Sequence, residues 1–451
     1  MAYDSMNVMT AADLAALIPE KWSKKIFNDA ISQAYWDSKN LVGPEGAMKA
    51  IVEKEDFTKE PTDKIHLMVM SELRGAGTTG ETRLQGREEK WSVGQFDVAV
   101  DWLKHAIGIT EKANKSALID AIVVAGAKLA PWLATKLSDD IFKEVLVTAL
   151  SKMNTLYADS VANRDTLVLG DANGYSTHSL DLDDISMVRL ALTRKGALPL
   201  MIRKKNGVRQ QWYGLVVSEI DGYRLTTTEA WQQAQRTANL AGEDENPIFT
   251  GSIGVFAGMI LYSYSGIADD KRKGTPLRPE AVLVEDTAAG AGVPKTIKVG
   301  SLSDDGIDYT RNFPTPAGGG SINVWTGNPA GGEIADIKAV RISYSSKTNN
   351  TLECTVAPDT LYAEAPVGTV VTLENVSRNL GFGAEVVARG WGLKPIKATN
   401  SESYGDDLGV GIKCVYGVKA IENTDGKIPN AVILETYAHN QIGRASCRER
   451  V

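Results

Sequence analysis

The sequence predicts an α+β fold, because helix-like and strand-like periodicities occupy different parts of the chain. Between residues 117 and 129, apolar residues recur every three or four positions, as on one face of a helix. Ile65, Leu67 and Val69 instead alternate with other residues, which is the period of a strand. Residues 276–375 are rich in Gly, Ala, Thr and Pro and contain only short β-like runs. The chain therefore combines helices, a hairpin and a separate β-rich region.

The bulk properties are those of a large globular chain and argue against several classes of protein. The 451 residues are enough for two or three folding units. With 49 basic and 56 acidic side chains the net charge is −7, which disfavours nucleic-acid binding by the molecule as a whole. The three cysteines are far apart and suggest neither disulfides nor zinc. No export signal is expected, and the uncharged stretch 247–267 has too many glycines for a membrane helix.

Residues 1–60 are predicted to form an N-terminal arm. Thr10 and Asp13 have the spacing of a capping box, and an apolar helical stripe runs from Trp22 to Ile31. An ordinary packing helix explains this stripe equally well.

Residues 61–110 are predicted to form a long hairpin. The return strand alternates through Phe96, Val98, Val100 and Trp102, and the segment between the strands is rich in Gly and charge. Because a long two-stranded hairpin is marginal alone in water, it needs another surface on which to lie.

Residues 111–160 are predicted to be helical, with an interruption at Pro131. A proline inside a helix costs about 3 kcal/mol, so we expect a kink or a restart there. Ser138, followed by two aspartates, offers a second helix start.

Residues 161–275 mix helices and strands. A capped helix is expected over 181–192, and strands 198–203 and 211–217 flank Asn206-Gly207, a strong hairpin signal. The run 213–225 is predicted to be a strand, followed by a helix over 226–240 capped by Thr228. In the inserted region 276–375, strands are expected at AVLV, TIKV, AVRISY, LECTV and GTVVTL, and the last strand of the chain at 431–436.

No catalytic, cofactor or metal site is predicted. The glycines at 75–80 lack the Gly-Lys-Ser/Thr ending of a phosphate loop. None of the four histidines has a ligand partner at helical spacing, and no nucleophile elbow is present. An enzyme is therefore the least favoured class.

One segment, residues 185–218, contains seven basic residues and no acidic one. It could face DNA and bind it by charge alone, but a solvated hairpin tip is the slightly favoured alternative. The basic residues nearest the expected turn are Arg194, Lys195, Arg203, Lys204, Lys205 and Arg209.

Three blocks of sequence resemble one protein family. The block at 226–267 carries Trp231, Gln235, Asn246, Pro247, Phe249 and Gly251. The block at 72–91 carries Leu73, Gly75, Gly77, Gly80, Leu84, Gly86, Glu88 and Glu89, and the block at 378–392 reads RNLGFGAEVVARGWG. Together they resemble the major capsid proteins of tailed double-stranded-DNA phages, in the N-four-like podovirus branch. The sequence departs from these relatives at 213–225, where a His-Pro often follows the strand.

The resemblance implies a Hong Kong 97-type fold with a role in building a shell. Its parts would be the arm at 1–60, the extended hairpin or E-loop at 61–110, the spine helix at 111–160, the axial and peripheral core at 161–275, the inserted β-rich domain at 276–375 and a return to the core at 376–440. Copies would form pentamers and hexamers in the host cytoplasm and close an icosahedral virion capsid around DNA. Scaffold, portal and decoration proteins are the implied partners, with no membrane contact.

Two other functions remain open at this point. A cellular nanocompartment shell, as in encapsulins, shares the fold. An adhesion or carbohydrate-binding protein would explain region 276–375 but not the arm, hairpin and spine helix before it.

The last residues, 441–451, read QIGRASCRERV, which matches one translated frame of a widely used sequencing adapter. We expect them to carry no biological information and the native sequence to end near Asn440. A genuine basic tail is the alternative.

Overall fold

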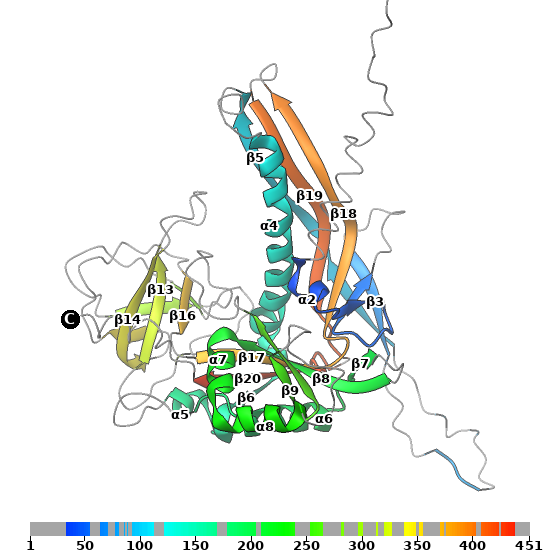
Figure 1. The fold of residues 1–451 in the computed structure, drawn as a ribbon, viewed down its shortest axis with the longest axis vertical. Helices are drawn as coiled ribbons and strands as arrows, with labels where there is room; N and C mark the ends of the chain where they lie inside the picture. Colours follow the sequence, from blue (N-terminus) through cyan, green and yellow to red (C-terminus); the bar gives the residue numbers. More distant parts are fainter. Residues whose placement is uncertain are drawn as a thin grey trace, which may run out of the picture. The chain divides into compact units, whose positions relative to one another are not determined.

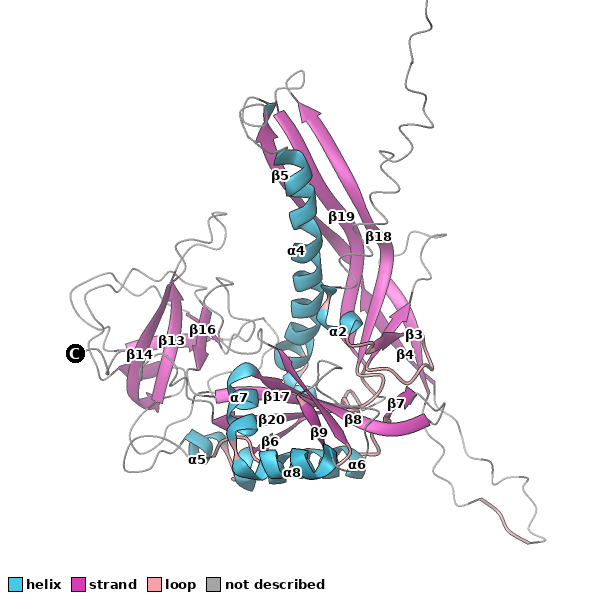
Figure 2. Cartoon of the chain, viewed as in Figure 1, coloured by secondary structure: helices cyan, strands magenta, loops and turns pink. Residues whose placement is uncertain are grey.

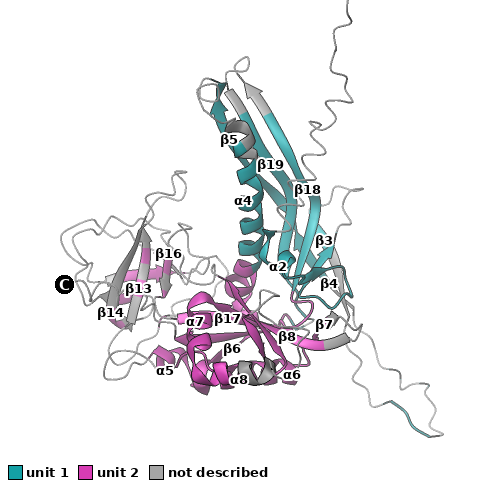
Figure 3. Ribbon diagram, in the orientation of Figure 1, with its two compact units in different colours: residues 1–141, 387–425 teal, residues 142–386, 426–451 magenta. Residues whose placement is uncertain are grey.

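A computed structural model describes two compact units of the chain (Figure 3). Unit 1 contains residues 1–141 and 387–425, and unit 2 contains residues 142–386 and 426–451. The residues that the structure describes are 33–54, 64–70, 77–80, 85, 88, 93–111, 121–168, 178–203, 209–239, 253–264, 281–283, 296–300, 313, 320–326, 338–348, 351–354, 370–373, 376–402, 407–423 and 425–437.

Unit 1 is built on a five-stranded sheet with the order β1-β2-β18-β19-β5 (Figure 1). The strands are β1 (Val42–Gly43), β2 (Ile51–Lys54), β18 (Val387–Glu402), β19 (Asp407–Ala420) and β5 (Asp101–Thr110). The short helix α2 (Tyr35–Ser38) precedes β1. The sheet therefore joins the beginning of the described chain to a segment more than 300 residues later.

The long helix α4 (Ala121–Lys143) packs along one face of this sheet (Figure 2). Leu129, Leu133 and Leu137 are buried against Val410 and Ile412 of β19. Burying each leucine contributes about 1.5–3 kcal/mol, so the row as a whole exceeds the cost of one proline.

The predicted restart within this helix is therefore wrong. α4 runs unbroken through Pro131. The free energy gained by burying its apolar face offsets the backbone hydrogen bond that the proline removes. Ser138 does not begin a second helix. Its hydroxyl donates to the carbonyl of Ala134, one turn earlier in the same helix. Beyond α4 the chain widens into the π-helical turn Glu144–Thr148 and then tightens into the 3₁₀ turn Leu150–Lys152.

The predicted hairpin is present as β3 (Lys64–Met70) paired antiparallel with β4 (Val93–Ala99). Its return strand ends earlier than the alternation indicated, since Trp102 belongs to β5 of the five-stranded sheet. Alternation alone cannot show where a chain leaves one sheet and enters another.

Unit 2 contains a seven-stranded sheet with the order β6-β20-β17-β8-β10-β9, and β7 also pairs with β8. The strands are β6 (Asn154–Tyr157), β20 (Ala431–Tyr437), β17 (Val376–Phe382), β8 (Arg209–Ser218), β10 (Met259–Tyr264), β9 (Gly254–Phe256) and β7 (Leu200–Arg203). β17 and β20 are buried along their whole length, which fits central strands covered on both faces.

Helices α6 (Leu182–Arg194), α7 (Glu219–Thr227) and α8 (Glu229–Asn239) share a hydrophobic core with this sheet. The capped helix expected at 181–192 is confirmed: Asp181 and Asp184 form a capping box at its start. The hairpin expected around Asn206-Gly207 is also confirmed at its described strands, where β7 pairs with β8.

The strand predicted over 213–225 is only half correct. β8 ends at Ser218, whose hydroxyl accepts a hydrogen bond from the backbone N–H of Asp221 and so caps α7. Thr228 stands directly before α8 (Glu229–Asn239), the position expected for its cap, and its hydroxyl donates to the carbonyl of Leu225 at the end of α7.

The inserted region forms a closed barrel with the strand order β11-β12-β15-β14-β13-β16. Its strands are β11 (Ala281–Leu283), β12 (Thr296–Gly300), β15 (Thr351–Cys354), β14 (Lys338–Thr348), β13 (Gly320–Thr326) and β16 (Val370–Leu373). Five of these match the predicted runs, whereas β13 was missed because glycines precede its short alternation.

Within the described part of the chain, no helix has the length and apolarity to cross a membrane.

Candidate functional site

Two glycines on unit 1 form a flat seat for the root of the hairpin. Gly390 of β18 and Gly417 of β19 lie directly opposite each other, so both face the same side of the sheet. A β-carbon on Gly390 would lie 1.8 Å from Cδ1 of Ile65 in β3, and one on Gly417 would lie 2.0 Å from the carbonyl oxygen of Ala99. We call these two residues the glycine seat.

Apolar and basic side chains hold the hairpin root on this seat. Ile65 and Val98 are fully buried in one cluster with Phe96 and Ala388. Lys419 lies over the ring of Phe96, with Nζ 4.6 Å from its centroid, and donates to the carbonyl of Asp97. The base of the hairpin is therefore fixed to the sheet from which the rest of it extends.

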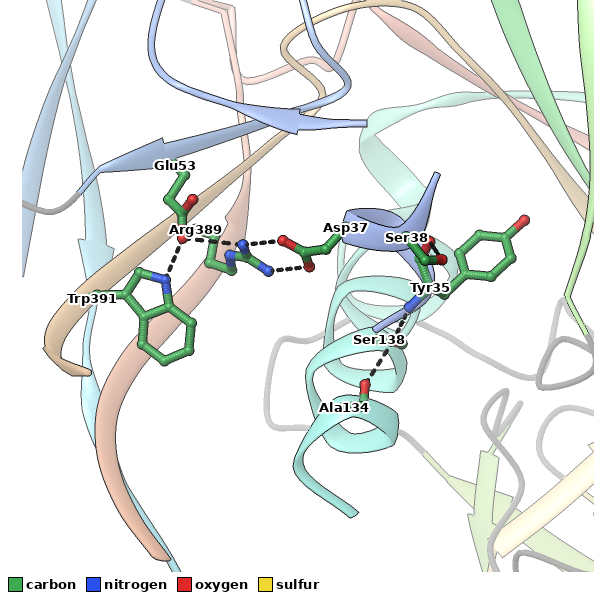
Figure 4. Close-up of polar contacts among 8 residues, drawn as sticks. All are labelled: Tyr35, Asp37, Ser38, Glu53, Ala134, Ser138, Arg389 and Trp391. Carbon is green, nitrogen blue, oxygen red and sulfur yellow. Dashed lines mark hydrogen bonds and ion pairs between the residues drawn. The ribbon is translucent and has the colours of Figure 1, made fainter. Parts of the chain in front are cut away.

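A buried ion pair fixes the beginning of the described chain to the same sheet (Figure 4). Arg389 of β18 donates two hydrogen bonds of 2.8 Å to the carboxylate of Asp37 in α2. It donates a third, of 3.1 Å, to Glu53 of β2, and Glu53 also accepts a 2.6 Å bond from the indole N–H of Trp391. Together Asp37, Glu53, Arg389 and Trp391 form what we call the arm anchor.

Helix α4 holds α2 from another direction (Figure 4). The backbone N–H of Tyr35 donates to Ser138 Oγ over 3.0 Å, and Ser138 is itself buried. Since the predicted N-terminal arm spans residues 1–60, this contact and the arm anchor hold its described part, residues 33–54, on unit 1.

Most of the predicted hairpin residues fall outside the described part of the chain. Gly77 and Gly80 are described and have φ of +70° and +71°, the left-handed region that favours glycine. Glu88 is described and exposed. Leu73, Gly75, Leu84, Gly86 and Glu89 lie outside the described residues.

The predicted signature block is described only in its helix. Trp231 of α8 is buried and packs near Phe256 of β9, with ring centroids 6.5 Å apart. Gln235 lies in α8, where nothing is described of its side chain, and Asn246, Pro247, Phe249 and Gly251 lie outside the described residues. Where it is described, the block serves packing, since Trp231 joins α8 to the core of the sheet.

The predicted basic residues do not all share one role. Arg194 is exposed at the end of α6, whereas Lys195 donates to the carbonyl of Ala431, and partial burial lowers its pKa. Arg203 and Arg209 face each other in the β7–β8 ladder, and Lys204 and Lys205 lie outside the described residues. Arg203 and Arg209 are therefore placed opposite each other by the backbone register alone.

The block RNLGFG owes its glycines to close packing. A β-carbon on Gly381 would lie 2.3 Å from Val188 of α6, and one on Gly383 would lie 2.1 Å from the carbonyl oxygen of Leu198. Sequence reasoning marked these glycines only as part of a resemblance. The structure gives their physical role, which is to let α6 and the backbone at 198 approach β17.

A strained corner in unit 2 is held by carboxylates. Asp159 and Ser160 both have positive φ, which is unfavourable for residues with a β-carbon. Asp184 accepts from the backbone N–H of Asp159 over 2.9 Å, and His178 Nδ1 lies 2.7 Å from the Asp159 carboxylate. Burial, together with the charges of Asp159 and Asp181, raises the pKa of Asp184 to about 6, although two backbone N–H bonds oppose the shift.

This shift predicts a pH dependence of stability. Since the folded protein binds the Asp184 proton more tightly than the unfolded chain, the contribution of Asp184 is fully present below pH 3.8 and is lost as the pH rises through 6. The free energy of unfolding in urea should therefore contain a contribution that decreases between pH 4 and 6 in the wild type and is absent in Asp184→Asn. Asp183→Asn, at an exposed neighbour, is the control; an unchanged profile in Asp184→Asn would contradict the assignment.

Comparisons with known proteins agree on one family and one fold. A family model described as phage capsid protein matches residues 4–268. The capsid of Ralstonia phage GP4 is similar over 90% of this chain and 92% of its own, with 15% identity and a TM-score of 0.53. The capsid asymmetric unit of cyanophage Pam1 is similar over 91% and 93%, with 15% identity and a TM-score of 0.52. The capsid of Helicobacter pylori bacteriophage KHP30 is similar over 88% and 90%, with 14% identity and a TM-score of 0.51.

These matches confirm the expected Hong Kong 97-type α+β fold. No curated protein matches the sequence.

Proposed function

The chain belongs to the phage capsid protein family and is a structural shell protein, and on this premise we propose that it is the major capsid protein of a tailed double-stranded-DNA phage. Many copies form pentamers and hexamers and close an icosahedral shell. The observation that carries this proposal is the family match, which spans more than half of the chain. No observation favours a cellular nanocompartment or an adhesin.

The hairpin supplies the contact between copies in this proposal. Its root is fixed on the glycine seat, whereas its tip, residues 71–92, reaches over the next subunit. The tip residues proposed to make this contact are Leu73, Gly75, Gly77, Gly80, Leu84, Gly86, Glu88 and Glu89. Because each copy gives and receives one hairpin, modest individual contacts add up around a closed shell.

The proposed parts of the subunit follow the boundaries expected from the sequence. They are the arm at 1–60, the E-loop at 61–110, the spine helix at 111–160, the core at 161–275, the inserted domain at 276–375 and the return to the core at 376–440. The N-four-like podovirus branch is the proposed subfamily, supported by the block that contains Trp231 and Gln235.

The proposed partners are other copies of this chain, scaffold, portal and decoration proteins, and packaged DNA, with assembly in the host cytoplasm. The DNA contact would use Arg194, Lys195, Arg203, Lys204, Lys205 and Arg209 through charge alone. Changing Arg203, Lys204 and Lys205 to glutamine should then leave shells intact but lower the salt concentration at which DNA dissociates from isolated subunits. Unchanged salt dependence would assign this segment to a solvated hairpin.

The oligomeric state in solution tests the proposal as a whole. Sedimentation of the purified chain, alone and with its phage's scaffold protein, should show species far heavier than the 48.5 kDa monomer. A single 48.5 kDa species at every concentration would contradict it.

A further inference from the structure

The core of the inserted barrel includes residues that lie outside the barrel. Leu167, on the short helix α5 (Arg164–Val168), is fully buried in the same cluster as Val324, Tyr344 and Leu352 of the barrel. Ala158, directly after β6, is also buried there. Tyr157, Val161 and Val168 pack against the same cluster. The segment 157–168, together with Val376 of β17 in the same cluster, therefore completes a core that it shares with the six strands.

The first residue of α5 is bonded to the seven-stranded sheet. Arg164 Nε donates to Glu435 Oε2 of β20 over 2.7 Å, and Arg164 Nη2 donates to the other carboxylate oxygen. Glu435 also accepts a 3.1 Å bond from Arg378 of β17, and Arg378 donates onward to the carbonyl of Leu146. One buried carboxylate thus joins α5 to two central strands.

The charge of Arg164 also reaches the barrel. Burial raises the pKa of Glu435, but the charges and hydrogen bonds of Arg164 and Arg378 outweigh it and hold the pKa at about 2. Burial raises the pKa of Tyr344 in β14, and the charges of Asp165 and Arg164 act on the same hydroxyl. Tyr157, opposite Glu435 in the β6–β20 ladder, lies against the barrel core.

We propose that α5 is a coupling element that joins the inserted barrel to the seven-stranded sheet, with Leu167 completing the barrel core and Arg164 clamping β20 through Glu435. The barrel is then an integrated part of unit 2 rather than an independent module on a tether. A change in the barrel, such as binding of another protein, would reach β20 through α5, in addition to the direct packing of Val376 of β17 in the barrel core. This inference does not depend on shell formation and is tested on unassembled subunits.

The two ends of the coupling element can be tested separately by hydrogen exchange of the full chain. Leu167→Ala removes a buried leucine at the barrel end and should speed exchange in β12, β14 and β15 roughly tenfold or more. Leu192→Ala is the matched control, because Leu192 is equally buried in α6 but belongs to the core of the sheet. Leu192→Ala should not speed hydrogen exchange of the barrel strands beyond any change seen in the rest of unit 2.

Glu435→Gln tests the other end and does not touch the barrel core. It should speed exchange in β20 and also in the barrel strands, because Arg164 loses its carboxylate partner. Leu167→Val provides a milder change at the first end if the alanine variant does not fold. Faster exchange confined to α5, or equal loosening of unit 2 by all variants including Leu192→Ala, would overturn the proposal.

Discussion

Replacing Arg389 with methionine is expected to destabilise unit 1 by about 3–5 kcal/mol, because it leaves a buried carboxylate without its partner. The side chain of Arg389 is fully buried, and among the described residues its guanidinium is the only hydrogen-bond partner of the two Asp37 carboxylate oxygens. The loss should be concentrated at residues 33–54, where hydrogen exchange would show that α2 and β2 open first. Release of this segment should also reduce the yield of assembled particles, since the predicted arm, residues 1–60, would no longer be held on unit 1.

Two further variants test whether the loss of stability comes from the unpaired buried carboxylate. Adding Asp37→Asn to Arg389→Met removes the unpaired carboxylate and should recover part of the lost stability. Lys136→Met breaks a partly exposed ion pair with Asp140 in the same unit and should cost about 1 kcal/mol or less. If Arg389→Met costs no more than Lys136→Met, the arm anchor does not stabilise unit 1.

Alanine at Gly417 is expected to displace the root of the hairpin and to block assembly. The added methyl would meet the backbone carbonyl of Ala99 at 2.0 Å, and backbone cannot move aside as a side-chain end can. Overpacking of this kind costs about 1–3 kcal/mol or more. Gly390→Ala should have a smaller effect of the same kind, because the atom it meets is the end of the Ile65 side chain.

Gly108→Ala is the matched control for the glycine seat. Gly108 lies in β5 of the same sheet, and a β-carbon there would meet no atom within 4 Å. Exchange of β3 and β4 amides, together with the fraction of chain in large particles, would be measured for each variant. Normal assembly of Gly417→Ala would show that the seat does not position the hairpin.

The sequence predicted an element correctly where the signal for that element lies within its own residues. The alternation at Ile65, Leu67 and Val69 predicted β3, and the capping box at Asp181 predicted α6, because both signals are local. α7 was misread as a strand because its cap, Ser218, also continues an apolar β run. At Pro131 a local rule predicted an interruption, but the long-range burial of Leu133 and Leu137 outweighed it.

The arm anchor and the glycine seat could not be predicted from the sequence, because the fold brings their residues together. Asp37 and Arg389 are separated by 352 positions, so no local pattern could pair them. Gly390 and Gly417 likewise gain their meaning only from the register that places them opposite each other. A glycine within a strand is a signal of close backbone approach, but the sequence does not say which segment approaches.

Electron microscopy of the purified chain tests the central claim, that this protein builds a phage shell, most directly. The chain would be imaged after size-exclusion chromatography, as residues 1–440 and at full length, beside Gly417→Ala and Gly108→Ala. Closed shells or capsomer rings are predicted for the unchanged chain and for Gly108→Ala, with few or none for Gly417→Ala. A monomer at every concentration, even with the scaffold protein of its phage, would contradict the claim.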